Sequence, residues 1–373
     1  MVRNKRYIQL REALQMADNN DVFVFVGSYA ESEDSGVYVY TLDEATGQLT
    51  RVDEVAGLKN PTFLNVDLDQ HKLYAISETL SAEGAKIGEI VAFTVDPTTG
   101  TLKLINRKNS VQATTCHIQR DSEGKFLTVT SYHGGMIGLI SLEQDGNLGE
   151  LLDVKQHEGH SVHPNQDRPH PHSSFYSPDG KYLFVQDLGL DIIQAYSIDL
   201  DKQQLIKKGT THLHPGAGPR HLTFHPHGTY AFVINELDST ITSFTYDAEH
   251  GELKEQETVP TLPDGFTGEN GCAEITISQD GKFVYGSNRG HDSIVIYAFD
   301  EATGKLHLVE HVSCEGGHPR HFAITPNGDY LIVANRDTNN LVTFRVDQES
   351  GRLQYTGISE TVSKPVCVIP YYL

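Results

Sequence analysis

The stretch HPHSSFYSPDGKYLFVQDLGLD, residues 170–191, holds two short apolar runs on either side of a Pro-Asp-Gly-Lys turn. Two apolar runs of strand length around an Asp-Gly turn predict a β-hairpin. Polar residues mark two places in it: the opening His-Pro-His-Ser, and Asp187 at the end of the second run. In a hairpin these two places lie side by side, so the stretch predicts polar side chains gathered at one end.

The same hairpin recurs along the chain. Clear copies span 218–238, 271–292 and 318–337, and weaker copies span 60–79 and 114–133. Each copy is followed by another apolar run, an acidic turn and a fourth short strand. The acidic turn occurs seven times, about every 50 residues, as DEATGQL from Asp43, DPTTGTL from Asp96, EQDGNL from Glu143, DLDKQQL from Asp199, DAEHGEL from Asp247, DEATGKL from Asp300 and DQESGRL from Asp347. Four short strands at this period are typical of a propeller blade. The sequence therefore predicts an all-β fold, a seven-bladed β-propeller of four-stranded antiparallel blades.

The two ends of the repeat indicate how the ring closes. The first recognisable strand, 22–27, resembles the second strand of a blade, because Ser28-Tyr29 lies where Asn235-Glu236 lies in a later copy. Its missing partner is expected at 364–369, KPVCVI, which would complete the first blade and leave no open sheet edge. We expect one propeller domain over 21–373 and an N-terminal extension over 1–20, either a peripheral helix or a poorly ordered segment.

The amino-acid composition limits which kinds of partner the protein is expected to bind. The chain has 29 basic and 50 acidic residues and a formal net charge of −21. Such a surface repels nucleic acid and anionic membranes. No apolar stretch suits a signal peptide or a membrane span, and the four cysteines have no metal-ligand spacing, which favours free thiols in a reducing compartment. We expect a cytoplasmic protein, a monomer or weak homodimer, with no metal, no cofactor and no nucleic-acid or membrane partner.

Blade geometry predicts where the functional groups meet. In an antiparallel four-stranded blade, the loop into the first strand and the loop leaving the second share one face, and the first strand lines the central channel. Polar residues at the starts of first strands are Asn60, His117, His170, His172, Arg220, His221, Glu274, Arg320, His321 and Lys364; those at the ends of second strands are Tyr29, Glu78, His133, Asp187, Glu236, Arg289 and Arg336. A mouth this rich in arginine on an acidic protein predicts an anionic small ligand.

Four residues of this ring combine the groups that hydrolysis needs. A possible base, a carboxylate and two cations could activate water and stabilise an oxyanion. We expect His172, Arg220, Glu236 and Arg289 to be catalytic, and Arg320, Arg336, His221, His321, Asp187 and Glu274 to bind substrate. The alternative is that such residues only satisfy strand ends and buried water.

Other histidines are interpreted as structural. His225 and His227 belong to a turn on the opposite face and are expected to be turn residues. The loop 157–170 contains four histidines, but its His160-x-x-His163 lies on no predicted helix or strand. We interpret this loop as a variable rim over the mouth rather than a metal site.

The segments HPHSSFYSPDGKYLFVQDLGLD, GPRHLTFHP, VINEL and GKFVYGSNRGHDSI resemble the seven-bladed propeller lactonases. These include the bacterial propeller-type 6-phosphogluconolactonases and the fungal carboxy-cis,cis-muconate cyclases, and the resemblance runs from about residue 22 to the C-terminus. It implies a metal-independent enzyme acting on a lactone. In the cyclase branch a His, two Arg and a Glu are proposed as the active site, and by motif they fall on His172, Arg220, Glu236 and Arg289. Residues 1–20 and the His-rich loop depart from the family pattern, which leaves substrate size open.

Three functions follow as hypotheses. The first is hydrolysis of 6-phosphogluconolactone in the oxidative pentose-phosphate pathway, with His172 or Glu236 as general base, Arg220 at the oxyanion, and Arg289 with Arg320 or Arg336 at the phosphate. The second is a cyclase or lactonase acting on a carboxylated lactone such as carboxymuconolactone. The third is a non-catalytic propeller scaffold that binds partner proteins on its rim, since fold alone does not determine function.

Overall fold

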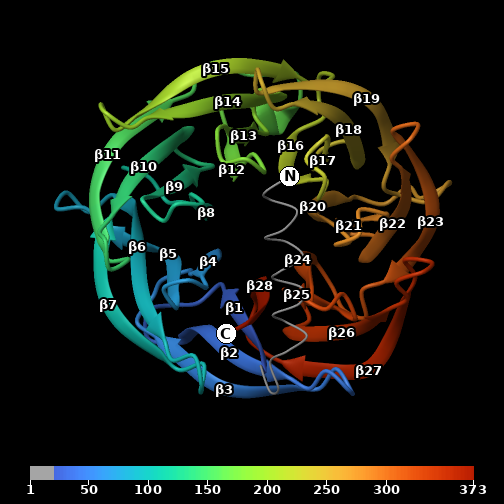
Figure 1. The fold of residues 1–373 in the computed structure, drawn as a ribbon, viewed down its shortest axis with the longest axis horizontal. Helices are drawn as coiled ribbons and strands as arrows, with labels where there is room; N and C mark the ends of the chain where they lie inside the picture. Colours follow the sequence, from blue (N-terminus) through green and yellow to red (C-terminus); the bar gives the residue numbers. More distant parts are fainter. Residues whose placement is uncertain (1–20) are drawn as a thin grey trace.

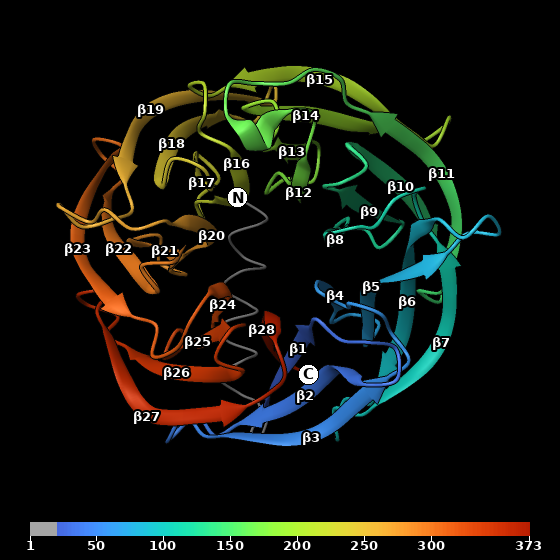
Figure 2. The same cartoon turned by 180° about the vertical axis from the view of Figure 1, so that it is seen from behind.

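The computed structural model describes residues 21–373 and contains seven four-stranded antiparallel sheets in a ring, as the repeat predicts (Figure 1). The sheets are blade 1 (β28-β1-β2-β3), blade 2 (β4 to β7), blade 3 (β8 to β11), blade 4 (β12 to β15), blade 5 (β16 to β19), blade 6 (β20 to β23) and blade 7 (β24 to β27). In both views the first strand of each blade is nearest the central axis and the fourth forms the outer rim (Figure 2).

The inner two strands of each blade are short. The first strands are β28 (Pro365–Tyr372), β4 (Leu64–Asp67), β8 (His117–Arg120), β12 (Pro171–Tyr176), β16 (Pro219–Phe224), β20 (Gly271–Ile277) and β24 (Pro319–Ile324). The second strands are β1 (Val22–Ser28), β5 (Lys72–Leu80), β9 (Phe126–Ser131), β13 (Leu183–Asp187), β17 (Tyr230–Asn235), β21 (Phe283–Arg289) and β25 (Tyr330–Asn335).

The outer two strands form the rim. The third strands are β2 (Ser35–Leu42), β6 (Lys86–Val95), β10 (Met136–Leu142), β14 (Ile192–Asp199), β18 (Thr240–Asp247), β22 (Ser293–Asp300) and β26 (Asn340–Val346). The fourth strands are β3 (Leu49–Ala56), β7 (Leu102–Asn109), β11 (Leu148–Gln156), β15 (Gln204–His212), β19 (Glu252–Pro260), β23 (Lys305–Ser313) and β27 (Leu353–Thr361).

The core lies between neighbouring blades. All seven residues of β1 are buried, because both faces of this strand pack against adjacent sheets, whereas most positions along β27 are partly or fully exposed. One cluster joins Val24 and Val26 of blade 1 to Ile332 and Leu341 of blade 7. Apolar runs are therefore continuous in inner strands and alternate in outer ones.

The C-terminal strand closes the ring as expected. β28 pairs with β1 in antiparallel register, with Val368 opposite Val26, and it extends past the predicted 364–369 to Tyr372. The prediction for residues 1–20 lies outside the described residues. No helix within 21–373 has the length and apolarity that crossing a membrane requires.

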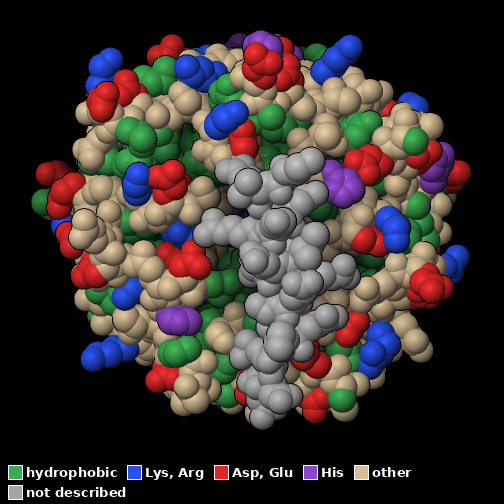
Figure 3. All heavy atoms as spheres, in the orientation of Figure 1, with side chains coloured by type: hydrophobic (Ala, Val, Ile, Leu, Met, Phe, Trp, Pro, Cys, Tyr) green, Lys and Arg blue, Asp and Glu red, His purple; other side chains and the backbone are tan. Residues whose placement is uncertain are grey.

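The acidic turns have a common local cause. The Asp43 carboxylate accepts hydrogen bonds from the backbone of Ala45 at 2.8 Å and Thr46 at 3.0 Å, and Asp300 accepts one from Ala302 at 3.0 Å. These are Asx turns, which explains why an aspartate opens nearly every one. On the face drawn in Figure 3, acidic and basic side chains are scattered around the rim rather than gathered over one element.

Candidate functional site

The backbone is kinked just before several of the first strands begin. The residue before a proline takes a left-handed conformation in four blades, with φ of 51° at Asn60, 68° at Gly218, 60° at His318 and 41° at Lys364. Non-glycine residues rarely adopt this conformation, and when they do it is often at a functional site. In each of these four blades the kink occurs where the backbone turns toward the central channel.

The first strands together line one small cavity in the channel. Two equivalent positions in the blades supply the wall. The position just after the proline position is occupied by Thr62, Cys116, His172, Arg220, Arg320 and Val366, and the next position by Phe63, His221 and His321. These nine side chains come from six of the seven blades. The predicted convergence of first-strand residues around the axis is thus present, and basic groups dominate the polar part of the cavity wall.

A buried ion-pair cluster lies against this wall. Glu236 Oε2 is 3.0 Å from Arg220 Nε and 2.8 Å from Arg289 Nη2. Arg220 Nη1 also donates to the Ala273 carbonyl at 2.5 Å, although its Nε is not aligned for a hydrogen bond with the carboxylate. Arg289 donates to the carbonyls of Gly271 at 2.9 Å and Cys272 at 2.6 Å. Three of the four predicted catalytic residues are therefore in direct contact.

Glu236 and Arg220 remain ionised at neutral pH. Burial alone would raise the pKa of Glu236, but Arg289 and Arg220 beside it lower that pKa below its ordinary value. Burial, with Arg320 and Arg289 nearby, lowers the pKa of Arg220 to about 9. Because both groups stay charged, Glu236 orients the arginines and offsets part of their charge.

His172, the fourth predicted catalytic residue, is only 5 % exposed and lies on the cavity wall. Its ring centroid is 5.3 Å from that of His221, and its Nδ1 has no hydrogen-bond partner among the residues that the structure describes. Burial and the charge of Arg220 lower the pKa of His172 well below the ordinary histidine value. The imidazole is therefore neutral at physiological pH and can accept a proton.

A second polar layer lies one residue further along the strands. Glu274 Oε2 is 3.0 Å from His221 Nδ1 and 3.2 Å from His321 Nε2, although neither contact is aligned for a hydrogen bond. Burial raises the pKa of Glu274, and burial lowers the pKa of His321 to about 4. Phe63 packs on His117 with ring centroids 4.3 Å apart. This layer is the floor beneath His172 and Arg220.

Three residues expected to bind substrate are not among the cavity-lining residues: Glu274, which contacts His221 and His321, and Asp187 and Arg336, which lie apart. Asp187 is fully buried, accepts hydrogen bonds from His170 N at 2.7 Å and Gly189 N at 3.0 Å, and contacts His157 Nδ1 at 2.6 Å. These contacts hold the 157–170 loop. Arg336 is about one-third exposed and pairs with Asp337 at 2.6 Å. Arg320, by contrast, does line the cavity, and its guanidinium lies 5.8 Å from the centre of the Tyr29 ring.

The His-rich loop is more ordered than its sequence indicates. It contains a 3-10 turn at Pro164–Gln166, and the buried Gln166 donates to Leu188 O at 2.8 Å and to Asp191 Oδ1 at 2.6 Å. His160 and His163 themselves lie on no helix or strand, as expected, and a buried amide anchors the loop to the β13–β14 connection. His163 accepts a hydrogen bond from Asn165 N at the start of that turn.

Phe63, Cys116 and Val366 belong to the cavity wall but were not among the predicted site residues. A search restricted to polar residues passes over all three. Aligning the first strands position by position would have found them, because they occupy the same places as His221 and Arg220.

We expect the free energy of unfolding to fall as the pH is lowered below about 6.5. Burial holds the pKa values of His117, His172 and His221 well below normal, so at low pH these histidines are protonated in the unfolded chain but not in the native state. Each of them lowers the free energy of unfolding by about 1.4 kcal/mol per pH unit. The raised pKa of Glu274 works in the opposite direction and offsets part of this. Chemical denaturation between pH 7.5 and 5.5 measures it. His117→Phe should flatten the slope, and an unchanged slope would contradict the expectation.

The family described as "Lactonase, 7-bladed beta-propeller" matches residues 23–370. The chain belongs to this lactonase family. It is 34 % identical to the 6-phosphogluconolactonase of Bacillus subtilis strain 168, over 92 % of this chain and 97 % of that protein. It is 36 % identical to a 6-phosphogluconolactonase of Formosa agariphila, over 89 % of this chain and 94 % of that one.

Solved structures of the lactonase family agree with this fold. A putative 6-phosphogluconolactonase from Bacteroides fragilis superimposes with a TM-score of 0.86 at 34 % identity, covering 95 % of this chain and 98 % of that one. The periplasmic gluconolactonase PpgL of Pseudomonas aeruginosa superimposes with a TM-score of 0.88 at 32 % identity, covering 94 % and 99 %. Membership of the family supports a lactonase function for this protein.

Proposed function

We propose that this lactonase-family protein hydrolyses 6-phosphogluconolactone to 6-phosphogluconate, in the oxidative pentose-phosphate pathway. The observation that carries the proposal is the channel cavity, where a neutral buried His172 lies on the same wall as Arg220 and Arg320. The names of the B. subtilis and F. agariphila relatives point to the same substrate.

The chemistry divides between a base and a cation. A water oxygen attacks the lactone carbonyl carbon while His172 takes the proton that the water loses. Arg220 stabilises the oxyanion that forms at the carbonyl oxygen. The tetrahedral intermediate then collapses, the bond to the ring oxygen breaks, and that oxygen takes the proton from His172 to become a hydroxyl group. The product is the open-chain carboxylic acid, which releases its proton to solvent at neutral pH to become the carboxylate, and the enzyme returns to its starting state.

The contacts favour different roles for the arginines. Arg289 is held by two backbone carbonyls and by Glu236, so we assign it and Glu236 to positioning Arg220. Arg320 lines the cavity and, within the described residues, makes no ion pair with a carboxylate. We therefore propose that Arg320, with Arg336 at the rim, binds the phosphate.

A panel of three lactones tests the substrate. Freshly prepared 6-phosphogluconolactone, unphosphorylated gluconolactone and carboxymuconolactone are compared by acid release above the spontaneous rate. The gluconolactone arm is included because a relative of similar structure carries that name. The proposal requires the highest kcat/KM for the phosphorylated compound, and no rate above background for it would overturn the proposal.

Arg320→Gln should raise the KM for 6-phosphogluconolactone about 10- to 100-fold and change gluconolactone turnover little, because a hydrogen bond to a charged group contributes about 1.5–3 kcal/mol. Steady-state kinetics on both substrates measure the difference. Arg107→Gln, an ion-pair partner of Glu89 on the outer strand β7, is the control. Equal losses on both lactones would remove Arg320 from the phosphate site.

The free cysteines underlie our proposal on location, and the acidic surface underlies our proposal on partners. We propose a cytoplasmic protein that is a monomer or weak homodimer, without nucleic-acid or membrane partners. Light scattering across a concentration series tests the assembly state.

A further inference from the structure

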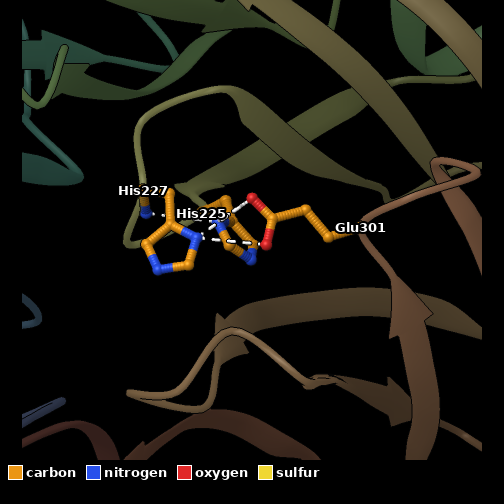
Figure 4. A group of neighbouring side chains, drawn as sticks. All are labelled: His225, His227 and Glu301. Atoms are coloured by element: carbon orange, nitrogen blue, oxygen red, sulfur yellow. Dashed lines mark hydrogen bonds and ion pairs between the residues drawn. The ribbon is translucent and has the colours of Figure 1, made fainter.

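Two turns on the face opposite the catalytic mouth bring three metal-binding side chains together. His225 and His227 lie in the β16–β17 turn of blade 5, and Glu301 lies in the β22–β23 turn of blade 6 (Figure 4). Their ligand atoms all lie within 4.8 Å of one another. His227 Nδ1 is 3.0 Å from Glu301 Oε1, and His225 Nδ1 is 4.0 Å from the same oxygen.

The equivalent junction between blades 7 and 1 carries different side chains. There the β24–β25 turn carries Thr325 and Asn327, and the amide of Asn327 donates to Glu44 Oε1 at 2.5 Å. Tyr330 OH donates to the Glu44 carbonyl at 3.1 Å, and Tyr230 OH makes the equivalent bond to Glu301 at 3.1 Å. The two junctions therefore share one backbone arrangement. His225 lies where the other junction has Thr325, and His227 lies where it has Asn327.

The two turns also have the same backbone. His225 N donates to Tyr230 O at 2.9 Å, and Thr325 N donates to Tyr330 O at 2.8 Å. Neither histidine is needed to make the turn, because Thr325 and Asn327 make it equally well. The earlier interpretation of His225 and His227 as turn residues is right about their place but leaves their side-chain chemistry unexplained.

His225 is held in position from behind. Its side chain is almost completely buried and packs on Phe299 with ring centroids 5.6 Å apart. Its Nε2 also lies close against the backbone of Gly281, where a Cβ atom would lie 2.2 Å from it. Only glycine at 281 allows this approach, which fixes the orientation of the ring.

The donor atoms of the three side chains already face one another within 4.8 Å. His225 Nδ1 accepts a 3.2 Å hydrogen bond from His227 N, which a metal would replace. Ligand atoms bonded to zinc at about 2.0–2.2 Å in a tetrahedron lie about 3.3–3.6 Å apart, between the two distances found here.

We infer that His225, His227 and Glu301 form a binding site for a divalent transition metal such as Zn²⁺, which links blade 5 to blade 6. Two imidazoles and a carboxylate suit zinc and its neighbours rather than calcium or magnesium. His227 and Glu301 are 64 % and 44 % exposed, so the fourth position is open to water. The site lies away from the cavity and does not depend on the proposed lactonase reaction.

The test uses the full chain, treated with EDTA and dialysed, then titrated with Zn²⁺ by calorimetry and followed by thermal unfolding. One site per chain and a zinc-dependent rise in Tm are expected. The double variant His225→Thr, His227→Asn copies the blade 7–blade 1 junction, so it should fold. It should bind zinc at least tenfold more weakly and lose the rise in Tm. Glu301→Gln should do the same.

His250→Asn is the matched control. His250 and Asp247 form an exposed pair on the same face, with Nδ1 2.8 Å from Oδ2 but no third ligand within 21–373. This variant should bind one zinc with wild-type affinity. Co²⁺ in place of zinc gives a visible absorption spectrum that reports the ligand set, and it should be lost in the double variant and kept in His250→Asn. If wild type and the double variant bind zinc equally, or if His250→Asn is the variant that loses it, the inference is wrong.

Discussion

Replacing Arg220 with glutamine is expected to lower kcat on 6-phosphogluconolactone about 10²- to 10³-fold, the usual cost of removing one oxyanion donor. Arg220 is 2 % exposed, lies on the cavity wall and is directed by Glu236 on one side and the Ala273 carbonyl on the other. Because the guanidinium is buried and already held in place, it needs little reorganisation when negative charge develops beside it. Its stabilisation of the transition state is therefore large. Single-turnover kinetics with purified protein measure it.

Loss of folding must be separated from loss of chemistry in that variant. Arg220 is among the largest fully buried side chains, so a lower Tm is expected as well. Glu236→Gln is the companion: it keeps the shape of the cluster but removes the charge that directs both arginines, and should lower kcat by a smaller factor. A folded Arg220→Gln protein with wild-type kcat would show that the oxyanion lies elsewhere.

The fold could be predicted almost completely because its signals are local and repeated. Each acidic turn depends on one aspartate that bonds to its own backbone, as Asp43 and Asp300 do. Ring closure by β28 was predictable because Lys364-Pro365 repeats the start of β16. Strand ends moved by a few residues, since pairing with β1 carries β28 on to Tyr372.

The candidate site was predictable only to the level of a ring of positions. Blade geometry places residues around one mouth but does not say which way each side chain turns. Asp187 occupies a ring position, yet its oxygens contact His170 N, Gly189 N and the His157 ring. Phe63 and Cys116 line the cavity although their polarity gave no reason to select them. His225 and Glu301 come from turns of different blades, so no single repeat shows them as neighbours.

Replacing His172 with glutamine should lower kcat about 10²- to 10⁴-fold if this residue is the general base. The structure favours His172 over Glu236 for this role. Glu236 contacts two arginines, so its carboxylate is already engaged in ion pairs, and it is not among the cavity-lining residues. His172 lies on the cavity wall, and its Nδ1 has no hydrogen-bond partner among residues 21–373.

The pH dependence of kcat/KM provides a second readout for His172. The base must be neutral to act, and burial together with Arg220 lowers its pKa well below 6.5. The rate above background should therefore be flat from pH 8 to about 6.5 and fall only at lower pH, as the imidazole becomes protonated. His170→Gln is the control, because His170 is buried near His172 and stacks on Tyr132 but is not among the cavity-lining residues. Should Glu236→Gln abolish turnover while His172→Gln keeps it, the base is the carboxylate, and Arg289 and Arg220 must release it when substrate binds.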